Sequence, residues 1–138
     1  MINSRNINDL HPHVAALCEA FIDACKVKDI DVIITSTYRD IESQNALYAQ
    51  GRTKPGKKVT NARGGDSYHN YRIAFDFCPI VNGKAHWNDS MTFTRCGEIA
   101  EGLGLVWAGR FKSFKELAHC QFTGGLSLAE LKQGKAIV

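Results

Sequence analysis

The sequence predicts an α+β fold in which helices flank a small, largely antiparallel central sheet. Apolar residues recur at three- and four-residue steps over 12–27, a β-branched run follows at 32–37, and Asn-Gly at 82–83 separates two short extended segments. These patterns are typical of an amphipathic helix, a buried strand and a type I′ hairpin turn. The 138 residues suit one domain, which we expect to span 1–138.

The first half of the chain is predicted to run helix, strand, helix and loop. Asp40 can cap a helix over 41–50, which Gly51 then ends, so Arg39 lies at a strand-to-helix junction. The segment 51–67 is rich in glycine and charge, and it is predicted to be one long loop. Loops of this length are often functional.

The second half is predicted to contain mostly short strands. We expect a strand at 73–77, a hairpin around Asn-Gly, a helix at 93–103 and a strand at 105–109. A loop then leads into a last strand, and Ser127 can cap a short closing helix.

Composition excludes several classes of protein. Hydrophobic residues make up 44% and charged residues 22%, values that fit neither a disordered nor a membrane protein. The net charge of +3 comes from scattered basic residues, so nucleic-acid binding is not expected. The N-terminus lacks the pattern of a secretory signal, and no apolar run approaches the length of a membrane span. We therefore expect a protein without stable membrane insertion that stays in the cytoplasm until another factor releases it.

The cysteines are expected to be reduced and mostly buried. They are odd in number and lack CxxC spacing, which argues against a disulfide framework and against a thiolate zinc site. They are Cys18, Cys25, Cys78, Cys96 and Cys120.

A zinc site can be built from His69, Asp76 and His119. Hydrolytic zinc takes three such protein ligands and keeps a fourth position for water. The first two side chains can meet if the chain turns between them, and the last lies in a segment predicted to run beside the same strand. Glu116, three residues before His119, is the natural general base. The alternative for each residue is an ordinary structural role, and His86 is a weaker alternative ligand.

Three polar residues are candidates for binding the substrate. Arg39 could stabilise an oxyanion or hold a carboxylate, and Ser67 and Gln44 could add hydrogen bonds. An arginine on a turn is, however, more often a surface cation or a salt-bridge partner. His11 and His13 flank a proline at a helix start, and we expect them to face solvent.

The sequence resembles the zinc peptidases of bacterial cell-wall peptides, the D-alanyl-D-alanine carboxypeptidase and L-alanyl-D-glutamate peptidase family that includes many phage endolysins. The family pattern SxHxxGxAxD is met at Ser67, His69, Ala74 and Asp76, and further matches are "STYRD", "LYAQGRTKPG" and "GLVWAGRFKSFKELAHCQF". The resemblance implies that His69, Asp76 and His119 bind one zinc ion, that Glu116 is the catalytic base, and that Arg39 and Ser67 contact substrate. It also implies that this site lies on the central sheet.

Three departures from the family pattern bear on these expectations. Arg72 occupies the usual glycine position, where a positive φ would strain arginine and an inward side chain would oppose metal binding. Ala118 replaces the usual proline before the last ligand. Arg110 and Phe111 replace a common Asp-Trp pair.

The function expected from the resemblance is cleavage of the L-alanyl-D-glutamate bond in peptidoglycan stem peptides, by a monomeric phage or prophage endolysin without a separate wall-binding domain. One alternative is a D,D- or L,D-carboxypeptidase that trims cell-wall peptides. Another is a catalytically impaired, zinc-stabilised wall-binding module.

Overall fold

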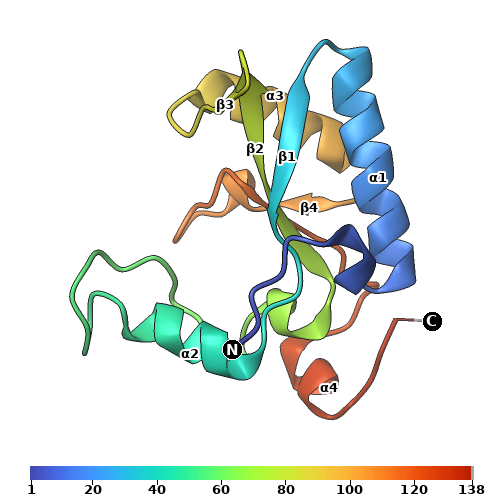
Figure 1. Ribbon diagram of the computed structural model, residues 1–138. Coiled ribbons are helices and arrows are strands. Elements are labelled where there is room, and N and C mark those ends of the chain that lie inside the picture. Colours follow the sequence, from blue (N-terminus) through green and yellow to red (C-terminus); the bar gives the residue numbers. More distant parts are fainter. Residues whose placement is uncertain (138) are drawn as a thin grey trace.

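The computed structural model describes residues 1–137, and in this part of the chain one sheet is flanked by four α-helices (Figure 1). The sheet order is β1-β2-β5-β4, with β3 paired to β2, and the paired strands run antiparallel. The strands and helices are β1 (Asp31–Ser36), β2 (Ala74–Val81), β3 (Lys84–Ala85), β4 (Val106–Trp107), β5 (His119–Gln121), α1 (Pro12–Val27), α2 (Ile41–Ala49), α3 (Ser90–Gly102) and α4 (Leu128–Lys132). The α+β expectation is confirmed.

The chain also forms short 3-10 helices, and one of them carries His69. They are η1 (Ile7–Asp9), η2 (Tyr68–Tyr71) and η3 (Ala108–Arg110). No helix within residues 1–137 is both long enough and apolar enough to cross a membrane.

Local sequence signals explain where the elements begin and end. The Asp40 side chain accepts a hydrogen bond from Ser43 N at 2.8 Å, which starts α2. Asn82 and Gly83 have φ values of 52° and 78°, the positive pair that a type I′ turn requires. This turn returns the chain as β3, and β2 therefore continues through Pro79 to Val81, four residues beyond the predicted strand end at 77.

The hydrophobic core lies between the sheet and the pair α1 and α3. Phe21 of α1 packs against Phe75 and Phe77 of β2, with ring centroids 5.6 and 4.9 Å apart, and Phe93 of α3 extends this stack. All five cysteines are buried and free, as expected. In Figure 1, α2 and the loop after it extend away from α1. The other side of the sheet, called the open side below, carries a cavity lined by residues of β1, β2 and β5.

A tryptophan connects this core to the loop before β5. The Trp107 ring fits between Gly97 and Gly109, where an added Cβ would lie 2.1 Å from a ring atom in each case. The Trp107 indole N–H donates to Leu117 O at 2.8 Å, and Glu116 N donates to Ala108 O at 3.2 Å. The segment that carries Glu116 is thereby fixed to β4 and η3.

Candidate metal and catalytic site

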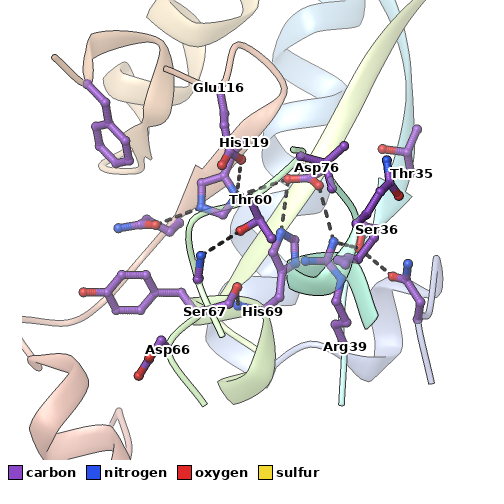
Figure 2. A pocket seen from close by; sticks show the side chains of 18 residues that line it. Thr35, Ser36, Arg39, Thr60, Asp66, Ser67, His69, Asp76, Glu116 and His119 are labelled. Atoms are coloured by element: carbon purple, nitrogen blue, oxygen red, sulfur yellow. Dashed lines mark hydrogen bonds and ion pairs between the residues drawn. The ribbon is translucent and has the colours of Figure 1, made fainter. Parts of the chain in front are cut away.

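His69, Asp76 and His119 meet on the open side of the sheet, as predicted from the sequence (Figure 2). Asp76 of β2 and His119 of β5 are direct partners in the antiparallel ladder, and His69 comes from η2. Asp76 Oδ1 lies 3.1 Å from His69 Nε2 and 3.1 Å from His119 Nδ1. Three donor atoms of these types within 4.8 Å of one another can hold one metal ion.

The outer nitrogen of each histidine already has an acceptor. His69 Nδ1 lies 2.8 Å from Thr37 O, and His119 Nε2 lies 2.8 Å from Gln121 Oε1. Each outer nitrogen must carry a proton to donate to these oxygens, so in the neutral rings the inner nitrogens present lone pairs to Asp76. Two lone pairs and a carboxylate would repel one another unless a cation sits between them. This donor set therefore fits zinc.

The electrostatics of the cluster also favour a positive charge beside Asp76. Burial alone would raise the pKa of Asp76, but the facing His69 and His119 outweigh it and hold the pKa well below its usual range. Burial lowers the pKa of His119, yet its hydrogen bond and charge interaction with Asp76 leave that pKa above its ordinary value. Both shifts are those of a partly buried carboxylate that interacts with positive charge.

A capped turn of 3-10 helix positions His69. The Ser67 hydroxyl accepts from His69 N at 3.3 Å, and the Asn70 side chain accepts in return from Ser67 N at 3.2 Å. Asn70 also donates to Arg39 O at 2.9 Å, which ties this turn to the segment after β1. Ser67 lines the cavity as well, so a substrate contact stays a prediction beside its capping role.

Glu116 lies beside the cluster, where a general base is needed. Its carboxylate is 3.9 Å from His119 Nδ1, and its side chain is 38% exposed, so water can reach it. Burial, the largest influence, raises the pKa of Glu116, and Asp76 adds to this, whereas the two histidines and Arg39 oppose it. A carboxylate with a raised pKa is a stronger base than one at the ordinary value.

Arg39 lies on a different side of the cluster from Glu116 (Figure 2). Its guanidinium donates to Gln44 Oε1 at 2.8 Å and to Ser36 Oγ at 3.1 Å, and it lies 3.8 Å from Asp76 Oδ2. Burial lowers its pKa, an effect countered by Asp76 and Glu116. Of the two ordinary roles expected for Arg39, the surface cation is wrong, because Arg39 is only 8% exposed, whereas the salt bridge is present, to Asp76.

The expectation that Gln44 contacts substrate needs correction. Gln44 is completely buried and does not line the cavity. Its carboxamide oxygen accepts from Arg39, and its nitrogen donates to Ala62 O at 2.9 Å. Gln44 therefore positions Arg39 and the long loop, because the helix that carries it packs behind the guanidinium.

The site opens into a cavity of about 460 Å³. Several of its lining residues were not anticipated from the sequence. Gln121 follows His119 by two residues in a strand, and side chains at this spacing point to the same face of a sheet. The sequence could therefore have indicated Gln121 as a cavity residue. Thr60 and Asp66 lie in the loop predicted at 51–67, and Phe111 is a departure from the family pattern, but no such signal marks Asn3, Thr35, Ser36 and Tyr68.

Arg72 adopts the strained conformation expected from its glycine position but points away from the metal ligands. Its φ is 66°, in the left-handed region. Its side chain donates to Asp9 O at 2.8 Å, and the guanidinium lies 3.8 Å from the centre of the Tyr38 ring. Arginine at the usual glycine position therefore leaves the group of metal ligands intact.

The other departures and histidines do not belong to the ligand cluster. Arg110 pairs with Glu101 at 3.0 Å, and Ala118 O accepts from Phe77 N at 2.9 Å. His11 caps α1 and is half-buried, contrary to the expected exposure, whereas His13 is exposed, although its ring lies 4.8 Å from Phe122. His86 is exposed and does not belong to the candidate ligand cluster.

Comparison with known proteins shows the family. The family model described as "VanY: D-alanyl-D-alanine carboxypeptidase" matches residues 7–117. The chain is 41% identical over 129 residues to the peptidoglycan L-alanyl-D-glutamate endopeptidase CwlK of Bacillus subtilis, a match that covers 83% of this chain and 74% of CwlK.

Solved structures share the fold at lower identity. The L-Ala D-Glu endopeptidase ChiX of Serratia marcescens has a TM-score of 0.64 at 17% identity, over 89% of this chain and 90% of ChiX. The D,D-pentapeptidase VanY in complex with Zn(II) has a TM-score of 0.66 at 14% identity, over 96% of this chain and 84% of that one. With the ligand cluster, these matches confirm the expected zinc metallopeptidase. The chain belongs to the VanY, or D-alanyl-D-alanine carboxypeptidase, family.

Proposed function

We propose that this protein is a zinc endopeptidase that hydrolyses the L-alanyl-D-glutamate bond of peptidoglycan stem peptides. The observation that carries the proposal is the complete His69, Asp76 and His119 cluster, with Glu116 beside it, in a chain 41% identical to an endopeptidase of that specificity. The intact cluster also disfavours the reading as a catalytically impaired wall-binding module.

The residues divide the chemistry between them. Zinc held by the cluster would lower the pKa of a bound water to about 7 and polarise the scissile carbonyl. Glu116 takes a proton from the attacking water and passes it to the leaving amine. Arg39, held by Gln44 and Ser36, provides a fixed positive charge for the oxygen that becomes negative in the transition state.

A carboxypeptidase that trims terminal residues is the second candidate, favoured by the description of the matching family. Mass spectrometry of purified peptidoglycan fragments, incubated with and without a zinc chelator, separates the two. We expect chelator-sensitive fragments split between L-alanine and D-glutamate. Loss of a terminal D-alanine alone would contradict the endopeptidase and support the carboxypeptidase. The absence of any product would contradict both enzyme assignments.

We further propose that the protein is a phage or prophage endolysin that acts as a monomer after release from the cytoplasm. Support comes from the "YAQGRT" and "FKSF" segments, which resemble those of phage and bacterial L-alanyl-D-glutamate endopeptidases. Expression in a bacterial host should cause lysis only when the inner membrane is permeabilised. Lysis without permeabilisation, or none after it, would contradict this role, and sedimentation velocity tests the monomer.

A further inference from the structure

The N-terminal segment Ile2–Ser4 lies outside the matched residues 7–117, yet it forms part of the cavity wall. Ser4 N donates to Tyr38 O at 2.8 Å, Thr37 N to Ser4 O at 2.7 Å, and Asp40 N to Ile2 O at 3.0 Å. This pairing continues the antiparallel pattern beyond β1 and places Asn3 opposite Arg39. Asn3 is therefore held at the edge of the active site by backbone hydrogen bonds.

The Asn3 carboxamide turns its oxygen toward Ser36. A guanidinium can only donate, so Ser36 Oγ must accept from Arg39, from which it lies 3.1 Å away. The one Ser36 hydroxyl proton is then free to go to Asn3 Oδ1, at 2.9 Å. Figure 2 shows Ser36 between these two interactions. Asn3 is exposed at the mouth of the cavity, and its amide nitrogen keeps both protons for solvent or a ligand, because it has no hydrogen-bond acceptor within residues 1–137.

This wall of the cavity therefore combines a positive charge with donors that the protein does not satisfy. Arg39 Nε is buried and also lacks a hydrogen-bond partner among the described residues. A cationic guanidinium next to an unpaired amide nitrogen suits an anionic oxygen. In a γ-linked stem peptide, the D-glutamate next to the scissile bond keeps its α-carboxylate free, and this group is an anion of the required kind.

We propose that Asn3 is a substrate-binding residue whose Nδ2 donates to this carboxylate beside Arg39. The proposal rests on the proposed function, because it takes a stem peptide as substrate. The Asn3–Ser36–Arg39 chain fixes both donors in one orientation before the peptide arrives, which reduces the entropy cost of binding.

Binding to the zinc-loaded Glu116→Ala protein tests the proposal without turnover. The probes are L-alanyl-γ-D-glutamyl-L-lysine and the same peptide with the D-glutamate α-carboxylate amidated, each titrated by calorimetry. Asn3→Ala should weaken binding of the acidic peptide about tenfold or more, as expected for one charge-assisted hydrogen bond. It should weaken binding of the amidated peptide less. Asn3→Asp should bind the acidic peptide worse than Asn3→Ala, because it adds a like charge.

Asn8→Ala is the matched control, because Asn8 is exposed in the same N-terminal region but does not line the cavity. If Asn3→Ala changes the affinity for the acidic peptide by less than twofold, the proposal is overturned. If it weakens binding of both peptides equally, the assignment to the carboxylate is overturned. In the enzyme with Glu116 intact, Asn3→Ala should raise KM with little change in kcat. A fall in kcat alone would instead assign Asn3 to positioning Arg39. If the unmutated enzyme neither cleaves nor binds the peptides, the proposed function itself fails.

Discussion

Replacing Gln121 by alanine should weaken zinc binding without unfolding the protein. Gln121 is 7% exposed, and its Oε1 is the acceptor, at 2.8 Å, for the outer nitrogen of His119. With a metal on Nδ1 the proton of His119 must stay on Nε2, so the substitution leaves a buried N–H unpaired in the zinc-loaded form, at a cost of about 1–3 kcal/mol. Because about 1.4 kcal/mol corresponds to a factor of ten, zinc affinity should fall roughly 5- to 150-fold. This range includes the 10- to 100-fold typical of such outer partners.

Competition with a chromophoric chelator measures this affinity directly. Gln121→Glu keeps an acceptor at the same place and should retain or increase affinity, whereas Gln133→Ala, at an exposed position, should have no effect. The apo forms of Gln121→Ala and the parent protein should differ less in thermal stability than their zinc-loaded forms. Zinc affinity within twofold of the parent would refute the assignment of Gln121 as the residue that orients His119.

Three further predictions test other parts of the structure. Glu116→Gln should lower kcat by about 100-fold or more, with zinc occupancy by metal analysis unchanged; retained activity would contradict its role as base. Gly97→Ala should cost about 1–3 kcal/mol in urea unfolding, because its Cβ would lie 2.1 Å from the Trp107 ring. At Gly102, in the same helix, an added Cβ would have no atom within 4 Å, so Gly102→Ala should be neutral or stabilising. If both substitutions lowered the stability equally, the packing argument would be contradicted. Arg72→Gly should leave zinc affinity unchanged, since its side chain points away from the cluster, and a marked change would contradict that placement.

The sequence predicted the ligands and most elements because local signals determine them. The helix over 12–27, the cap at Asp40 and the Asn-Gly turn all lie where residue type alone placed them. His69, Asp76 and His119 were found because their chemistry is specific and their sequence order matches a family pattern. These are properties of single residues or short segments.

Long-range pairing is what the sequence could not supply. Nothing in the local pattern of Asn3 indicates that it pairs with Arg39, because the contact depends on how the N-terminal segment packs beside the end of β1. Gln44 was assigned to substrate because its type suits hydrogen bonding, but in the fold its side chain is buried and accepts from Arg39 instead. In both cases tertiary packing, rather than residue chemistry, decides which polar group faces the cavity.

The apolar core determines the geometry of the site through the register of β2 and β5. Side chains alternate between the two faces of a strand, so Phe75 and Phe77 pack on Phe21 while Asp76 between them faces the cavity. In β5, Cys120 is buried in the core and His119 faces the cavity. A slip of one residue would move Asp76 into the core and both phenylalanines into the cavity, which the loss of buried apolar area opposes. The phenylalanines on either side of Asp76 therefore keep its carboxylate opposite His119.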